Sequence, residues 1–222
     1  METFAAAALA APAAKYVLYL VTDAGLSRGR SHLRIVETAM RGGVTIVQYR
    51  EKSASTRRMI EEAAELCRLC RAAGVPFIVN DRIDVALAID ADGVHIGQDD
   101  MPAALARRIL GRGKILGVSA GSVEEARKAF DDGADYIGAS PVFSTPTKPD
   151  APSPLGIEGL RRMTQAVEIP VVAIGGITED NAAAMMEAGA AGIAVVSAIV
   201  ASEDVEAAAR ALRIVVEKVR TG

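Results

Sequence analysis

The sequence contains no tryptophan, and only 4% of its residues are aromatic. So few rings argue against a stacking surface for single-stranded nucleic acid. An excess of one charge is also missing, because 25 Lys and Arg residues nearly balance 28 Asp and Glu residues. No apolar run is long enough to cross a bilayer. We therefore expect neither a nucleic-acid partner nor a membrane partner for this chain of 222 residues.

Cysteine is scarce as well, with only Cys67 and Cys70 in the segment EEAAELCRLCRAAGV. The segment has a helical pattern, and a spacing of three residues places both thiols on one face. No second Cys or His pair completes a zinc site, and no strand precedes them as in a thioredoxin-like motif. We expect inert core residues in a reducing compartment, and hence a cytoplasmic protein. The oligomeric state stays open, a homo-oligomer included.

The N-terminal segment METFAAAALAAPAAKY lacks the basic start and the strong apolar centre of a secretory signal peptide. We interpret residues 1–15 as an Ala-rich tail or a short helix. Residues 16–222 show no linker and no low-complexity block, so we expect a single catalytic domain there.

What the sequence does contain is a repeated unit, in which a helical pattern ends in Gly and a short apolar strand follows, as in RGGVTIVQY. Continuous apolar strands are typical of a parallel sheet covered by helices. We expect strands near residues 16–22, 45–50, 76–80, 93–97, 114–119, 136–143, 170–175 and 192–197. We expect helices near residues 31–42, 55–73, 82–90, 102–110, 122–132, 156–167, 178–188 and 203–219. Eight such units predict an α/β fold, a (β/α)8 TIM barrel; the alternative, a doubly wound open sheet, lacks the expected GxGxxG.

Polar residues follow nearly every predicted strand, and in such a barrel the chemistry lies at the carboxyl ends of the strands. Each of them taken alone is explained by local turn chemistry. Asn80 and Asp81 could cap the third helix, and Asp99 and Asp100 could cap the fourth. Seven of the eight strands, however, deliver polar residues or Gly to the same rim. This joint pattern predicts a binding site.

The charged residues at this rim are of two kinds. Asp81 and Asp100 follow neighbouring strands, and such carboxylates suit Mg²⁺, which commonly binds one or two of them together with substrate phosphates. Arg50, Lys52 and Lys148 place cations around the same mouth. Carboxylates and cations together suggest a diphosphate that is bridged by metal and held by Arg and Lys.

A second anion site is predicted on the opposite side of the rim. Gly176 and Ser197 follow strands seven and eight, the common phosphate-binding position of these barrels. Glycine there lets backbone N–H groups approach the anion closely. We therefore expect two small-molecule phosphorylated substrates, one a diphosphate and the other a monophosphate.

Taken in order, YLVTD, VQYREK, FIVNDRID, GVHIGQDD, GVSAGS, STPTK, AIGGIT and VVSAI resemble the motifs of the thiamine-phosphate synthase family. The resemblance covers essentially the whole chain from Tyr16. It implies a transferase of thiamine biosynthesis that joins 4-amino-5-hydroxymethyl-2-methylpyrimidine diphosphate to 4-methyl-5-(2-phosphoethyl)thiazole, giving thiamine phosphate and pyrophosphate. It also implies Mg²⁺ as cofactor and a dissociative substitution, in which diphosphate leaves before the thiazole nitrogen attacks.

Carried over position by position, the resemblance implies three groups of site residues. Contacts to the pyrimidine diphosphate are Gln48, Arg50, Lys52, Asn80, Ser119 and Lys148, of which Arg50, Ser119 and Lys148 are implied to be catalytic. The thiazole-phosphate pocket comprises Thr145, Thr147, Gly176, Val196 and Ser197. The metal ligands are Asp81 and Asp100, whereas Asp99 is not a ligand.

The run STPTK is interpreted as a loop that serves both substrates, with its threonines toward the thiazole and Lys148 toward the diphosphate. We expect the loop 144–154 to close over the reactants as a lid. The chain departs from the family pattern at Ala139-Ser140, at Ser144, where Pro is common, and at Tyr49, where Leu is usual. We expect Tyr49 to alter the packing near the diphosphate.

The implied reaction needs no strong general base, and the chain has only two histidines. We expect His32, at a predicted helix start, on the surface. We expect His95, on strand four, to be a packed and hydrogen-bonded residue and not a proton shuttle.

Three other functions remain as alternatives. A thiazole tautomerase of the same fold would share the thiazole-phosphate pocket without needing the metal and diphosphate residues. A phosphosugar epimerase or aldolase would require a catalytic Lys or paired acids inside the barrel, because a fold alone does not fix a function. A non-catalytic phosphate-binding protein would have no need of both carboxylates and the cations at one rim.

Overall fold

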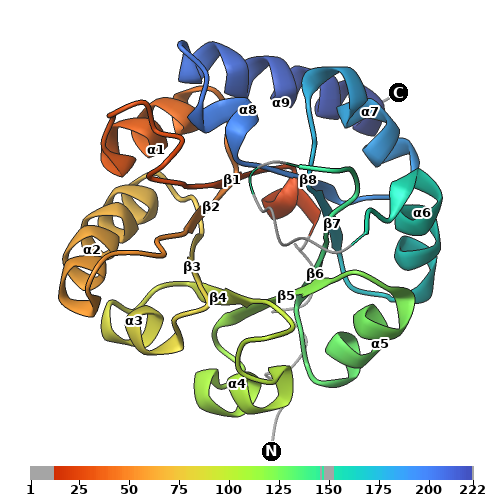
Figure 1. The fold of residues 1–222 in the computed structure, drawn as a ribbon, viewed down its shortest axis with the longest axis horizontal. Coiled ribbons are helices and arrows are strands. Elements are labelled where there is room, and N and C mark those ends of the chain that lie inside the picture. Colours follow the sequence, from red (N-terminus) through yellow and green to blue (C-terminus); the bar gives the residue numbers. More distant parts are fainter. Residues whose placement is uncertain (1–12, 146, 148–152, 222) are drawn as a thin grey trace, which may run out of the picture.

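The computed structural model describes residues 13–145, 147 and 153–221 and shows a closed parallel barrel inside a ring of helices (Figure 1). Every strand pairs with its neighbours in chain order, and β8 closes the barrel against β1 with Ile193 opposite Leu18. The strands are β1 Leu18–Val21, β2 Ile46–Tyr49, β3 Phe77–Asn80, β4 Gly93–Ile96, β5 Ile115–Ala120, β6 Tyr136–Ala139, β7 Val171–Ile174 and β8 Gly192–Val195. The predicted (β/α)8 barrel is confirmed, and the open-sheet alternative is wrong.

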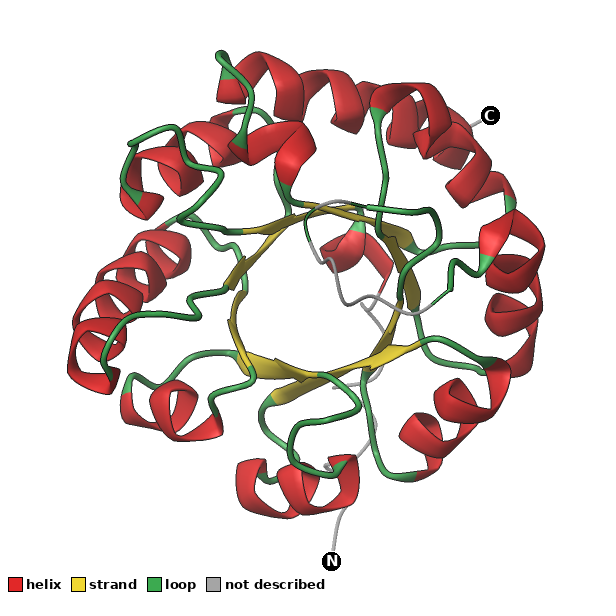
Figure 2. Cartoon of the chain, in the orientation of Figure 1, coloured by secondary structure: helices red, strands yellow, loops and turns green. Residues whose placement is uncertain are grey.

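Helices cover the outer face of the barrel on all sides (Figure 2). They are α1 His32–Arg41, α2 Thr56–Ala72, α3 Ile83–Ala88, α4 Ala103–Leu110, α5 Val123–Asp131, α6 Gly156–Ala166, α7 Glu179–Glu187, α8 Ser197–Val200 and α9 Val205–Thr221. A 3-10 turn, η1 Ala13–Tyr16, leads into β1. Most of the predicted N-terminal tail, residues 1–12, lies outside the described residues. Among those described, no helix is long and apolar enough to span a membrane.

Strands six and eight are shorter than the sequence predicts. β6 ends at Ala139 and not near residue 143, because Pro141 has no N–H to donate to the ladder. β8 ends at Val195, and Ser197 starts the additional four-residue helix α8. The sequence gives no sign of this helix, since SAIV continues the apolar run of the strand.

Apolar side chains form two layers, because successive residues of a strand point to opposite sides of the barrel wall. The outer layer lies between strands and helices and includes Cys67 and Cys70. Both thiols are buried, and burial raises the pKa of Cys70 to about 12, so the prediction of inert core cysteines is confirmed. The inner layer fills the barrel and consists of Tyr16, Tyr19, Val21, Ile46, Ile78, Tyr136, Val172 and Ala194.

Two glycines make room for large rings inside the barrel. A Cβ on Gly117 of β5 would lie 2.1 Å from Cζ of Tyr136. A Cβ on Gly138 of β6 would lie 3.0 Å from Cε1 of His95. These close approaches let the Tyr136 and His95 rings lie against β5 and β6 inside the barrel, where both line the cavity described below.

Outside the barrel, His32 and Tyr49 share the carboxylate of Glu62. The expectation of a surface His32 is wrong: it is 4% exposed, because its ring packs edge-on against Tyr49 and its Nδ1 lies 3.1 Å from Glu62 Oε1. Tyr49 donates to Glu62 Oε2 at 2.8 Å. Its ring therefore faces the helices, since it alternates along β2 with Gln48 and Arg50. Tyr49 does not line the cavity described below, and its effect on the packing near a diphosphate stays a prediction.

Candidate active site

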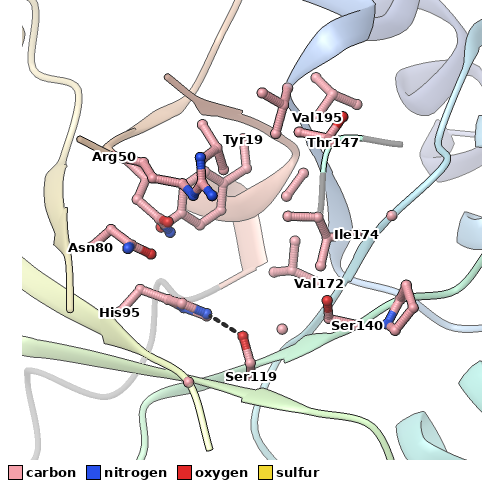
Figure 3. Close-up of a pocket in the computed structure, with 18 of the residues that line it drawn as sticks. Tyr19, Arg50, Asn80, His95, Ser119, Ser140, Thr147, Val172, Ile174 and Val195 are labelled. Carbon is pink, nitrogen blue, oxygen red and sulfur yellow. Dashed lines mark hydrogen bonds between the residues drawn. The ribbon is translucent and has the colours of Figure 1, made fainter. Parts of the chain in front are cut away.

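A cavity of about 250 Å³ opens at the carboxyl ends of the strands, and residues from all eight strands or the loops after them line it (Figure 3). The structure brings together every predicted site residue that it describes. These are Gln48, Arg50, Lys52, Asn80, Asp81, Asp100, Ser119, Thr145, Thr147, Gly176, Val196 and Ser197. Their roles toward ligands stay predictions.

Lys148 lies outside the described residues, as do Pro146 and residues 149–152 of the loop 144–154. The predicted placement of Lys148 beside a diphosphate, and the predicted closure of this loop, are therefore not described by the structure. Thr145 and Thr147 on the same loop do line the cavity, where the Thr147 N–H donates to Oγ1 of Thr145 at 3.2 Å.

Asp81 and Asp100 do not cap the helices that follow them. Arg82 is the N-cap of α3 and Pro102 is the N-cap of α4, and neither helix has a side-chain cap. Asp81 adopts a left-handed backbone with φ 60°, which is uncommon outside glycine and is found preferentially at functional sites. Asp100 instead accepts the Gly97 N–H through Oδ2 at 2.7 Å. Local turn chemistry therefore does not explain why Asp81 is there.

The two carboxylates interact with each other and with one cation. Burial raises the pKa of Asp100, and a hydrogen bond and repulsion from Asp81 raise it further. Lys52 Nζ lies 2.5 Å from Asp81 Oδ2 and offsets part of this negative charge. Asp99 is exposed and does not line the cavity. The cavity thus holds a pair of carboxylates whose negative charge Lys52 neutralises only in part.

This pair suits Mg²⁺ better than a softer metal. Within residues 13–145, 147 and 153–221, no group of three or more His, Cys, Asp and Glu side chains could hold a metal ion. Zinc and similar metals need such a group, whereas Mg²⁺ commonly binds one or two carboxylates and takes its other oxygen ligands from water and substrate phosphates. The residues present, Asp81 and Asp100, therefore fit a metal that is completed by its substrate.

Arg50 is held in place by a residue to which the sequence assigned no role. Its Nη1 lies 2.6 Å from Oδ2 of Asp23, while Oδ1 of Asp23 accepts the Leu26 N–H at 3.1 Å. The Thr22 hydroxyl accepts the Arg50 N–H at 3.0 Å. Asp23 follows β1 as Asp81 follows β3, so its position at a strand end was the signal that could have found it.

Tyr19, His95 and Tyr136 were also missed as site residues. His95 Nε2 lies 2.9 Å from Ser119 Oγ, and its Nδ1 lies 2.8 Å from the Tyr136 hydroxyl. The Tyr136 hydroxyl lies 2.7 Å from that of Tyr19, which accepts from Nε2 of Gln48 at 2.9 Å. Figure 3 shows the His95 and Ser119 side chains meeting at the cavity. The expectation of a packed, hydrogen-bonded His95 is confirmed.

The ionisation of these side chains follows from their position inside the barrel. Burial lowers the pKa of His95 to about 4, which leaves the imidazole neutral at neutral pH. Burial likewise raises the pKa of Tyr19 and of Tyr136, so both hydroxyls keep their protons. The set is therefore uncharged and acts through hydrogen bonds alone.

The side of the cavity formed by β7 and β8 is mostly backbone. Gly175 and Gly176 have φ of 100° and 64°, and Ser197 is the first residue of α8, where N–H groups lack partners within the helix. A Cβ on Gly176 would lie 2.8 Å from both Cβ of Phe143 and the backbone oxygen of Ser144. Two features thus require glycine at position 176: its positive φ and the close approach of Phe143 and Ser144. The sequence had explained this glycine only by the close approach of an anion.

Together, the closed parallel barrel and the polar cavity at the carboxyl ends of its strands define a (β/α)8-barrel enzyme. The family described as "Thiamine monophosphate synthase" matches residues 18–199. Thiamine-phosphate synthase of Chloroflexus aurantiacus is 67% identical over 199 residues, which are 90% of this chain and 92% of that protein. Its counterpart in Moorella thermoacetica is 53% identical, over 91% of this chain and 97% of that protein. The chain belongs to the thiamine-phosphate synthase family.

Solved structures agree with this membership. The thiamine phosphate pyrophosphorylase of Pyrococcus furiosus superposes with a TM-score of 0.87 at 45% identity, over 93% of this chain and 98% of that one. A 3-hexulose-6-phosphate synthase has a TM-score of 0.67 at 17% identity, covering 90% of this chain and 99% of that one, which shows a shared fold alone. The resemblance noted from the sequence is confirmed, as is the class of transferase.

Proposed function

We propose that this enzyme joins 4-amino-5-hydroxymethyl-2-methylpyrimidine diphosphate to 4-methyl-5-(2-phosphoethyl)thiazole, forming thiamine phosphate and pyrophosphate with Mg²⁺ as cofactor. One observation carries the proposal. The carboxylates and cations of β2, β3 and β4 face the same cavity as the glycine backbone of β7 and the start of α8. A single cavity with both kinds of surface suits two phosphorylated reactants held side by side.

The diphosphate is assigned to the side of the cavity that carries the side-chain charges. Arg50, oriented by Asp23, and Lys52, beside Asp81, are the cations proposed to bind its oxygens. Lys148 is assigned to the same diphosphate from its place in the sequence. The pyrimidine is assigned to Gln48, Asn80 and Ser119, whose uncharged donors and acceptors suit an aminopyrimidine.

The thiazole phosphate is assigned to the opposite side. Gly176, Val196 and Ser197 offer backbone N–H groups and a hydroxyl, and Thr145 and Thr147 add two more hydroxyls from the β6 loop. Neutral donors bind a phosphate without competing for the metal. The two anions are thereby kept apart although their reacting ends meet.

The chemistry expected of these residues is positioning and charge stabilisation. Mg²⁺ bound to Asp81 and Asp100 would neutralise negative charge that accumulates on the diphosphate as it departs. Arg50 and Lys52 stabilise the same charge, and the walls of the cavity hold the thiazole nitrogen in line with the pyrimidine methylene. No proton has to be removed by a strong base, which agrees with a neutral His95 whose two ring nitrogens are already hydrogen-bonded.

A coupling assay tests the proposal directly. Purified protein is incubated with both substrates, with and without Mg²⁺, and thiamine phosphate and pyrophosphate are quantified. We expect equal amounts of the two products, and only when both substrates and metal are present. Full activity in excess chelator would contradict the metal assignment. Isomerisation of the thiazole without any coupling would favour the tautomerase instead.

A further inference from the structure

Five side chains from five different strands form one continuous series of hydrogen bonds across the inside of the barrel. Gln48 contacts Tyr19, Tyr19 contacts Tyr136, Tyr136 contacts His95, and His95 contacts Ser119. The distances are 2.9, 2.7, 2.8 and 2.9 Å in that order. All five residues line the cavity, and the two ends, Gln48 and Ser119, are both predicted substrate contacts.

The direction of each bond follows from its donor at the Gln48 end. The amide nitrogen of Gln48 donates to the Tyr19 oxygen, and the buried Tyr19 hydroxyl has one other partner among the described residues, so its proton is directed to the Tyr136 oxygen. The Tyr136 hydroxyl then has Nδ1 of His95 as the partner for its own proton. An imidazole that accepts at Nδ1 carries its proton on Nε2, which lies against Ser119 Oγ.

The last bond decides what Ser119 offers to a ligand. Because Ser119 Oγ accepts from His95, its own hydroxyl proton takes no part in the series and is available to the cavity that Ser119 lines. We propose that Tyr136 is a positioning residue that holds His95 in the Nε2–H tautomer, so that Ser119 presents a hydrogen-bond donor to the substrate. On the proposed function, which this inference extends, the acceptor is a ring nitrogen of the aminopyrimidine.

The barrel is built to keep this arrangement in place. Tyr136 packs against Tyr16 with ring centroids 4.8 Å apart, and the absence of a side chain at Gly117 leaves room for its ring. The His95 ring lies against Gly138 in the same way. These close neighbours keep both rings within hydrogen-bond distance of their partners.

Tyr136→Phe keeps the ring and removes the proton donated to His95. The imidazole then gains access to its other tautomer, in which Nε2 accepts from Ser119 and the donor facing the cavity is lost. The expected effect is a fall of about tenfold in kcat/KM for the pyrimidine diphosphate, the value of one ordinary hydrogen bond. Tyr16→Phe is the matched control, because the Tyr16 hydroxyl makes no hydrogen bond among the described residues although its ring stacks on the same side chain.

Nitrogen-15 NMR of histidine-labelled protein reads the tautomer without any substrate. The chain has only two histidines, and His32→Gln identifies the signals of His95. At neutral pH we expect the wild type and Tyr16→Phe to carry the His95 proton on Nε2, and Tyr136→Phe to show a mixture or the Nδ1–H form. A wild-type proton on Nδ1, or an unchanged tautomer in Tyr136→Phe, would overturn the proposal. If Tyr136→Phe does not fold, Tyr19→Phe removes instead the hydroxyl that donates to Tyr136. The wild-type spectrum also tests the proposal by itself, because it shows which ring nitrogen of His95 carries the proton.

A double-mutant cycle shows whether Tyr136 acts through Ser119. In a Ser119→Ala background, Tyr136→Phe should lower kcat/KM by less than about twofold, because the group that it controls is already gone. An undiminished loss in that background would mean a merely structural role for Tyr136. If the wild type forms no thiamine phosphate, the proposed function fails, whereas the NMR result on His95 stands or falls by itself.

Discussion

Lys52 Nζ lies 2.5 Å from Oδ2 of Asp81, although the Lys52 side chain is 57% exposed and that of Asp81 only 20%. An exposed cation thus contacts the less exposed of the two groups. On the proposed function, a metal bound to Asp81 would displace Lys52 and leave it available to the diphosphate. The ion pair would thereby couple the two binding events, which makes Asp81 the first position to test.

Asp81→Asn should weaken Mg²⁺-dependent binding of the pyrimidine diphosphate by at least about tenfold. Mutating a residue that only hydrogen-bonds to a metal ligand already lowers metal affinity by about tenfold or more, so loss of a ligand should cost at least as much. Asn tolerates the left-handed backbone at this position, so the fold should persist. Affinity for the thiazole phosphate should hardly change. Calorimetry with each ligand measures both, and Asp99→Asn, on the exposed neighbour, is the control. Equal losses for both ligands in Asp81→Asn would disprove the division of the cavity.

Asp100→Asn should stabilise the metal-free protein at neutral pH. The pKa of Asp100 is raised by burial and by Asp81, so the folded state disfavours its charged form. A carboxyl group whose pKa is higher in the folded state than in the unfolded state lowers the free energy of unfolding as the pH rises from the unfolded-state pKa through the folded-state pKa. An amide can still accept the Gly97 N–H, and we expect Tm to increase by about 2 °C at pH 7, with the gain vanishing near pH 4. Mg²⁺ should raise the Tm of the wild type and not of the variant; a gain that grows in acid would contradict this account.

His95 should make the fold sensitive to mild acid. Burial lowers its pKa to about 4, against about 6.5 in the unfolded chain. Between these values the unfolded chain binds the proton and the folded one does not, so stability is lost as the pH falls, by at most about 1.4 kcal/mol per pH unit. Urea unfolding of the wild type and His95→Asn between neutral pH and the folded pKa measures this. The variant should show the shallower dependence, and parallel curves would count against the assignment.

Ser197→Ala tests the proposed monophosphate site more selectively than a substitution of Gly176. Ser197 is exposed, so the variant should fold normally and lose about tenfold in affinity for the thiazole phosphate, the value of one hydrogen bond to a charged group. The diphosphate affinity should be unaffected. Gly176→Ala, in contrast, would press against Phe143 and Ser144 and displace the loop that supplies Thr145 and Thr147. Gly176→Ala should therefore lower the affinity for both substrates. A loss of affinity for only one of them would argue against this packing.

Lys148→Ala should lower kcat by about 10²–10³-fold with little effect on thiazole-phosphate binding, as expected for a contact that acts mainly on charge developing in the transition state. The prediction depends on the place of Lys148 in the sequence, three residues after Thr145. Single-turnover kinetics separate the chemical step from product release. A change of less than about threefold would place Lys148 in solvent, away from the departing charge.

The fold was predictable because its signals are local. Gly between a helix and the next apolar strand recurs often enough to imply closure, and closure brings strand ends such as Asp81 and Asp100 together without any knowledge of side-chain packing. The same logic applies to Gln48 and Ser197. For these residues, being at a strand end was enough to place them at the cavity.

The inside of the barrel was not predictable in the same way. Tyr19 and Tyr136 stand in continuous apolar runs, where the sequence does not show which residues face the cavity and which face the helices. The outward direction of the Tyr49 ring was missed for this reason, and the burial of His32 because its partner Glu62 lies 30 residues away along the chain. Contacts across the barrel depend on register, and register is set only when all eight strands have closed.

The left-handed backbone of Asp81 limits how this protein can change over time. Glutamate would keep the charge but enters that backbone region at a greater cost, and asparagine would keep the backbone but not the charge. Position 81 therefore requires both a carboxylate and a residue that tolerates the left-handed backbone. Asp100 is not among the residues with positive φ, so its backbone does not disfavour glutamate, although its Oδ2 accepts the Gly97 N–H. In a mutational library selected for activity, position 81 should stay fixed while position 100 is free to vary between the two acids.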